Sequence, residues 1–140
     1  MTGVQTCALP IYSPSGLAAW LVEKFRSWSD CGGDVESAIS RDTMLANIST
    51  YWFSGTIGST ARRYRETKDA GLLGPTKQYV PVPTGAAIFP KEMSRPPRRW
   101  AERLYNIVHW TEMPRGGHFA ALEQPELWLG DVRAFARRFR

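Results

Sequence analysis

The second half of the chain alternates between strand-forming and helix-forming stretches, and this order restricts the possible folds more than any other feature. Residues 78–89 and 104–111 are rich in β-forming side chains. A short helical stretch over 98–103 separates them, and residues 125–139 follow with helical periodicity. Strand, helix, strand, helix predicts parallel pairing with a right-handed crossover. Since two strands do not complete such a sheet, the predicted fold class is an incomplete α/β domain.

The first half of the chain predicts helices without a strand. Ser13-Pro14 is a typical helix start, with serine as N-cap and proline in the first turn. Ser40 opens another helix, and Ser54-Gly55 predicts a break after it. Helices are expected over residues 13–28, 40–54 and 58–67, and a loop over 68–77. Residues 12–68 are therefore predicted to form a helical segment, and 69–140 an α/β region.

Length and composition indicate one globular domain. The chain has 140 residues, of which 43% are hydrophobic and 22% charged, without an apolar run of about 18 residues that could cross a membrane. The two cysteines, Cys7 and Cys31, have no partners at metal-ligand spacing, which favours a reducing compartment and a cytoplasmic location. The net charge of +5 raises the question of nucleic acid. The arginines of the chain do not interleave with aromatic residues at the spacing that base stacking requires. We therefore expect a solvated basic surface and no nucleic-acid partner.

The turn Arg115-Gly116-Gly117-His118 lies between the second predicted strand and the last helix. Glu92 follows the first strand, so parallel pairing would place Glu92 and His118 at the same carboxyl edge of the sheet, where sites are built. A carboxylate that accepts a hydrogen bond from one imidazole nitrogen leaves the other nitrogen available as a base. The pattern therefore predicts a Glu92–His118 pair.

Each of these residues also has a structural interpretation. Glu92 could be a solvated loop residue, and His118 a histidine that serves only the turn. His109 lies inside the second strand and is expected to pack against a neighbouring element.

Residues 1–11, MTGVQTCALPI, have no helical or strand periodicity and lack the pattern of a signal peptide. This segment resembles the translation of a sequencing-adapter oligonucleotide, which predicts that native sequence begins near Tyr12. The natural protein would then continue upstream.

Residues 13–140 resemble the C-terminal part of epoxide hydrolases of the α/β-hydrolase superfamily, in the branch of the microsomal and juvenile-hormone-type enzymes. Four segments in the same order carry the resemblance: SPSGLAAWLVEKFRSWSD, NISTYWFSGTIGSTARRYRE, VPTGAAIFPKE and RGGHFAALEQPE. It implies that the helical segment belongs to a cap, and that residues 69–140 supply the last two strands of the core.

The resemblance also implies a reaction. In the family an aspartate opens the epoxide to an alkyl-enzyme ester, two cap tyrosines bind the epoxide oxygen, and a histidine oriented by an acid activates water. His118 matches the base, Glu92 the acid and Tyr64 one tyrosine, with Tyr51 its nearest competitor. The aspartate, the oxyanion hole and the other tyrosine would lie before Tyr12, so the chain alone is expected to be inactive. The substrate would be a small apolar epoxide, without metal or organic cofactor.

Two other functions remain open. An esterase or haloalkane dehalogenase of the same fold would keep the acid and the histidine, and Tyr64 would then be an ordinary residue of an amphipathic helix. A non-catalytic binding domain would use the basic helices instead.

Overall fold

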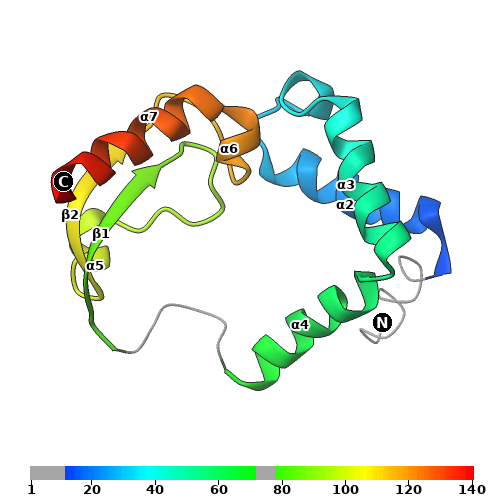
Figure 1. Ribbon diagram of the computed structural model, residues 1–140, viewed down its shortest axis with the longest axis horizontal. Coiled ribbons are helices and arrows are strands. Elements are labelled where there is room, and N and C mark those ends of the chain that lie inside the picture. Colours follow the sequence, from blue (N-terminus) through cyan, green and yellow to red (C-terminus); the bar gives the residue numbers. More distant parts are fainter. Residues whose placement is uncertain (1–11, 72–77) are drawn as a thin grey trace. The chain divides into compact units, whose positions relative to one another are not determined.

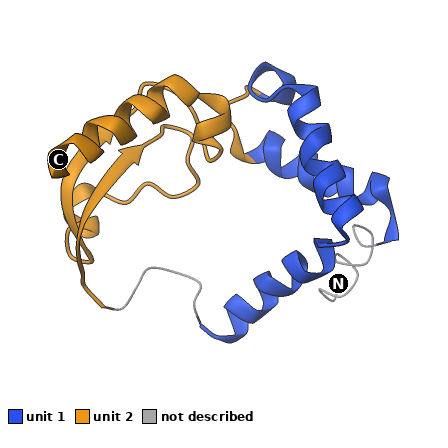
Figure 2. Ribbon diagram, viewed as in Figure 1, with its two compact units in different colours: residues 1–27, 33–74 blue, residues 28–32, 75–140 orange. Residues whose placement is uncertain are grey.

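A computed structural model of the chain describes residues 12–71 and 78–140. The chain divides into two compact units (Figure 2). Unit 1 comprises Met1–Ser27 with Gly33–Gly74, and unit 2 comprises Trp28–Gly32 with Pro75–Arg140. The adapter-like segment 1–11 and most of the expected loop 68–77 lie outside the described residues.

Unit 1 contains the helices that the sequence predicted, drawn in blue to green in Figure 1. They are α2 (Pro14–Trp28), α3 (Arg41–Ser54) and α4 (Ile57–Asp69), with a short 3-10 turn η1 (Val35–Ser37) before α3. Ser13 Oγ accepts a hydrogen bond from the Gly16 amide at 3.2 Å, which confirms the N-cap of α2. Ser40 Oγ likewise accepts from the Thr43 amide at 3.2 Å. Gly55 ends α3 with a φ of 66°, as the predicted break requires.

The core of unit 1 forms where its three long helices contribute one apolar residue each. Leu17 of α2 is fully buried, and Ile48 of α3 and Ile57 of α4 are also buried. Partly buried hydrophobic side chains pack around this cluster, among them Trp20, Leu21, Val22, Tyr51 and Trp52. Leu45, which helical periodicity places on the apolar stripe of α3, is instead 52% exposed. Periodicity defines a face of a helix, whereas the neighbouring helices decide how much of that face is covered.

Unit 2 is built on two strands, β1 (Val80–Ile88) and β2 (Tyr105–Glu112), which pair in parallel as the sequence predicted (Figure 1). The register is regular from Gly85↔His109 to Ile88↔Glu112. It is irregular at the start of β1, where Pro81 and Pro83 have no amide hydrogen to donate. There Asn106 Nδ2 donates to the Pro81 carbonyl at 3.0 Å, so a side chain replaces part of the ladder.

The helices of unit 2 are α5 (Arg98–Ala101), α6 (Ala120–Glu123) and α7 (Pro125–Ala136), and a 3-10 turn η2 (Arg137–Phe139) ends the last helix. Helix α7 packs on β1, where the Phe135 ring lies against Gly85 so closely that a Cβ there would be 2.9 Å from Phe135 Cδ2. The sequence did not predict α6, which is only one turn long. Its single turn nevertheless carries a buried carboxylate, Glu123, beside the predicted site.

Candidate active site

The carboxyl ends of β1 and β2 carry the two residues of the predicted pair. β1 ends at Ile88 and β2 at Glu112, and the Met113 amide donates to the Ile88 carbonyl at 2.8 Å, so the two segments leave the sheet together. Beyond the strands, Lys91 and Gly117 form a parallel bridge, in which the Lys91 amide donates to the Gly116 carbonyl at 3.0 Å. This bridge places the next residue of each segment, Glu92 and His118, side by side.

Both glycines before His118 are required by the space around them. Gly116 has a φ of +109°, and a Cβ there would lie 2.7 Å from Cδ1 of the buried Phe89. At Gly117 a Cβ would lie 2.6 Å from the Trp28 carbonyl oxygen. The turn can therefore pass between Phe89 and the backbone of residues 28–30 only without side chains.

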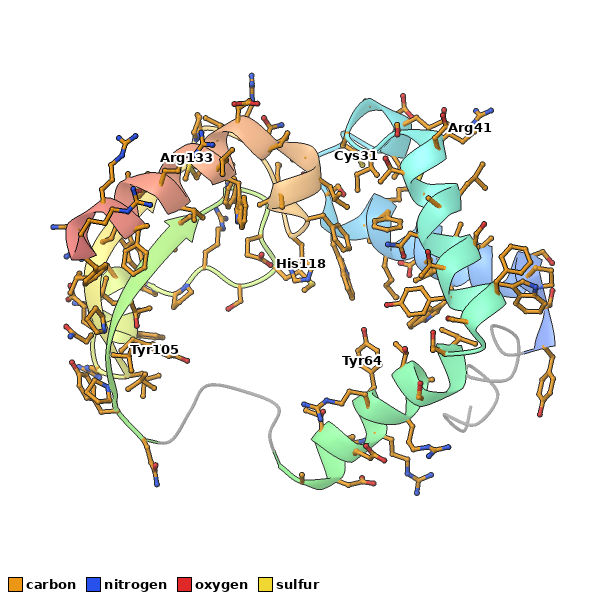
Figure 3. All side chains as sticks on the ribbon, viewed as in Figure 1. Cys31, Arg41, Tyr64, Tyr105, His118 and Arg133 are labelled. Atoms are coloured by element: carbon orange, nitrogen blue, oxygen red, sulfur yellow. The ribbon has the colours of Figure 1, made fainter. Side chains whose placement is uncertain are left out.

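The side chains of Glu92 and His118 are hydrogen-bonded. His118 Nδ1 lies 2.8 Å from Glu92 Oε1 and 3.1 Å from Oε2, and the Met93 amide donates to Oε1 at 2.7 Å. The His118 side chain is 36% exposed and the Glu92 side chain 31%, so the pair is partly shielded but accessible to solvent. Figure 3 shows the labelled His118 side chain standing out from the turn.

This geometry selects one imidazole tautomer. An ionised carboxylate can only accept hydrogen bonds, so Nδ1 must carry the proton that it donates to Glu92. The lone pair of Nε2 is then available to accept a proton, for example from water. The aromatic rings of Trp28 and Phe119 stand nearly perpendicular to the imidazole, at centroid distances of 5.3 and 5.2 Å, and limit its rotation.

The structure brings Glu92 and His118 together within unit 2. Tyr64 belongs to α4 in unit 1. Its side chain is 57% exposed, and its ring meets the Trp20 ring edge-on at a centroid distance of 6.3 Å. Tyr51, the competing tyrosine, packs against the core cluster of unit 1. The catalytic roles of Tyr64, Glu92 and His118 stay predictions at this point.

His109 makes the packing contact that its place inside a strand predicts. Its Nε2 lies 2.8 Å from Asp131 Oδ1 of α7 and 3.1 Å from Thr111 Oγ1, and both side chains of the His109–Asp131 pair are largely buried. The Phe135 ring lies beside it at a centroid distance of 5.9 Å. This second histidine–carboxylate pair therefore joins β2 to α7.

Three residues near His118 were not identified from the sequence: Trp28, Asp30 and Glu123. The Trp28 carbonyl accepts from the His118 amide at 2.9 Å, Asp30 Oδ2 from the Gly116 amide at 3.0 Å, and Glu123 from the Gly117 and Phe119 amides at 2.9 Å each. Trp28 and Asp30 looked like the end of a helix, and Glu123 like a polar residue before one. No local pattern marks them as neighbours of the turn.

Two further observations concern metal binding and membrane-spanning helices. Among residues 12–71 and 78–140, no group of three or more histidine, cysteine, aspartate or glutamate side chains could hold a metal ion. Within these residues, no helix has the length and hydropathy needed to cross a membrane.

Comparison with known proteins indicates the family to which the chain is related. No protein-family model matches it. It is 47% identical over 129 residues to a protein of Stigmatella aurantiaca that is provisionally named an epoxide hydrolase, and 39% identical over 132 residues to epoxide hydrolase 1 of Sus scrofa. These matches cover 91% and 88% of the chain, but only 29% of each relative.

The crystal structure of juvenile hormone epoxide hydrolase from the silkworm Bombyx mori superimposes with a TM-score of 0.86 at 28% identity. The superposition covers 97% of this chain and 34% of the silkworm protein. This chain is therefore a C-terminal fragment of an α/β-hydrolase domain whose homologues are epoxide hydrolases.

Proposed function

We propose that the protein to which this segment belongs hydrolyses epoxides to vicinal diols through an alkyl-enzyme ester. The hydrogen bond between His118 Nδ1 and Glu92 Oε1, at 2.8 Å, is the observation that carries the proposal. It holds a base with a free Nε2 at the carboxyl edge of a parallel sheet. The names of the relatives supply the substrate class.

The first step forms the ester. An aspartate outside this chain attacks one epoxide carbon, the carbon–oxygen bond breaks, and the ring oxygen takes a proton. An alkoxide is a poor leaving group near neutral pH, so a phenol that hydrogen-bonds the oxygen and donates its proton lowers the barrier. Tyr64 is one of the two phenols proposed for this step, and its exposed side chain can reach a ligand.

The second step releases the diol. His118 Nε2 removes one proton from water as the oxygen attacks the ester carbonyl. Collapse of the tetrahedral intermediate breaks the bond to the substrate oxygen, which takes the second proton of that water as the diol leaves, and the aspartate is regenerated as a carboxylate. The imidazolium then returns its proton to the tyrosinate that was formed in the first step. The imidazolium that forms is stabilised by Glu92, which already accepts the Nδ1 hydrogen. A different aspartate-dependent hydrolase, such as a haloalkane dehalogenase, would share this second step. The substrate of the first step therefore distinguishes the two.

Replacement of His118 in the full-length protein tests the proposal. A His118→Gln variant should form the ester at the normal rate but hydrolyse it at least about 100-fold more slowly, because the general base is gone. Intact-mass spectrometry after addition of styrene oxide should show the protein plus one substrate. His109→Gln makes the same replacement at the histidine that contacts Asp131 and not Glu92, and this variant should not accumulate the adduct.

Two results would refute the proposal. The first is a full-length wild-type protein that hydrolyses aryl esters or haloalkanes but leaves epoxides unchanged. The second is a His118→Gln variant that turns over epoxides as fast as the wild type does.

A further inference from the structure

Glu123 is a buried carboxylate that the proposed reaction does not use. Only 8% of the residue is exposed, and it is the one buried polar or charged residue among those that the structure describes. It ends the short helix α6, five positions after His118. Burial of a carboxylate is unfavourable unless hydrogen bonds replace its hydration, so Glu123 must find donors inside the protein.

The Glu123 carboxylate accepts three backbone hydrogen bonds. Oε2 accepts from the Gly117 amide at 2.9 Å and from the Asp30 amide at 2.7 Å, while Oε1 accepts from the Phe119 amide at 2.9 Å. It therefore holds the residue on each side of His118. It also ties that turn to residue 30, which is 93 positions away in the sequence.

Asp30 returns the contact. Its Oδ2 accepts from the Gly116 amide at 3.0 Å, and the nearby Trp28 carbonyl accepts from the His118 amide at 2.9 Å. Every amide from Gly116 to Phe119 is thus held by an acceptor, and two of the groups involved are carboxylates. Hydrogen bonds to charged acceptors are about twice as strong as neutral ones, so the backbone of His118 is held firmly.

We propose that Glu123 is a positioning residue for His118, with Asp30 as its partner. Glu123 fixes the amides of Gly117 and Phe119, and this sets the direction in which the imidazole leaves the turn. Glu92 then receives Nδ1–H, and Nε2 stays aimed at the reacting ester. The inference rests on the proposed function for its catalytic meaning, while its structural part concerns only this chain.

The test compares Glu123→Gln with a matched control. Glutamine has the same shape but presents an NH₂ group, a donor, to one set of amide donors, so at least one hydrogen bond is lost. Glu126→Gln makes the same charge change three residues later at an exposed position. Neither residue touches the reacting atoms in the proposed mechanism.

Histidine NMR on the full chain gives a direct readout, because the sequence contains only two histidines. In Glu123→Gln the ¹⁵N shifts of His118 should move away from the Nδ1–H tautomer, while those of His109, held by Asp131, stay as in the wild type. Amide exchange at residues 30, 117 and 119, whose amides donate to Glu123, should accelerate at least about tenfold where a hydrogen bond to the charged group is lost. Glu126→Gln should change neither.

Kinetics of the full-length protein give the second readout. Glu123→Gln should slow hydrolysis of the ester and leave its formation unchanged, so the adduct accumulates. Should Glu123→Gln fail to fold, Asp30→Ala removes only the acceptor of the Gly116 amide and should show the same pattern, with its largest exchange change at Gly116.

The outcomes are distinct. An unchanged His118 tautomer in the variants, or equal changes at His118 and His109, would overturn the positioning role in favour of general stabilisation. A wild-type protein without epoxide hydrolysis would refute the proposed function, whereas the NMR result on this chain would still stand.

Discussion

Tyr64 and Tyr51 are the two tyrosines that the sequence offers for binding the epoxide oxygen, and they differ in how deeply their side chains are packed. Both lie in unit 1, but Tyr51 packs on the core cluster of Leu17, Ile48 and Ile57. The Tyr64 ring touches Trp20 only edge-on, and more than half of the residue is exposed. A phenol that serves a substrate must be accessible, so the exposed tyrosine is the better candidate for ring opening.

Replacement of each tyrosine by phenylalanine in the full-length protein measures this difference. Tyr64→Phe should slow ester formation about 100-fold, because a proton donor to the epoxide oxygen is lost. Tyr51→Phe keeps the packed ring and should leave the rate unchanged. Rapid-quench measurement of the adduct gives both rates, and an undiminished rate in Tyr64→Phe would remove the residue from the site.

At the level of elements, the docking of α7 on β1 depends on the absence of a side chain at Gly85. The Phe135 ring occupies the space that a Cβ would take, and the His109–Asp131 hydrogen bond joins the same helix to β2. Trp128, Val132 and Phe135 line a cavity of about 250 Å³ beside Gly85 and Ala87. The helix is thus held at two points.

Gly85→Ala should lower the free energy of unfolding by about 1–3 kcal/mol, because the methyl group must displace the Phe135 ring. A Cβ added at Gly130, in α7, would meet no atom within 4 Å outside the local helix backbone, so Gly130→Ala should instead raise the free energy of unfolding by up to about 1 kcal/mol. Urea unfolding followed by circular dichroism compares the two variants. A smaller loss for Gly85→Ala in a Phe135→Leu background would confirm the contact, and equal losses would contradict it.

At the scale of the whole molecule, the chain spans about 29% of the length of its curated relatives. It contains the proposed base His118 and the proposed acid Glu92, but the proposed mechanism also needs a nucleophilic aspartate that no residue here matches. Within the described residues the sheet has two strands, so each is paired on one side only. Free strand edges favour association with other chains.

The isolated chain should therefore form diol from styrene oxide no faster than buffer does. Gas chromatography of the product, with the full-length protein as the positive control, checks this expectation. The reason is chemical: a histidine–glutamate pair can activate water for attack on an ester, but without an aspartate no ester forms. Turnover by the isolated chain at a rate that depends on His118 would contradict the two-step mechanism proposed for the full-length protein.

Local sequence determined the helices of unit 1, the parallel strands of unit 2 and the glycine turn that carries His118. Caps, periodicity and turn residues act over a few positions, so these features can be recognised without the fold. Only the tertiary structure decided what holds the turn, since Asp30 and Glu123 meet across 93 positions and Asp30 and Gly116 across 86. Such contacts arise when packing brings buried donors to a carboxylate that would otherwise lose its hydration, and no local pattern encodes that meeting.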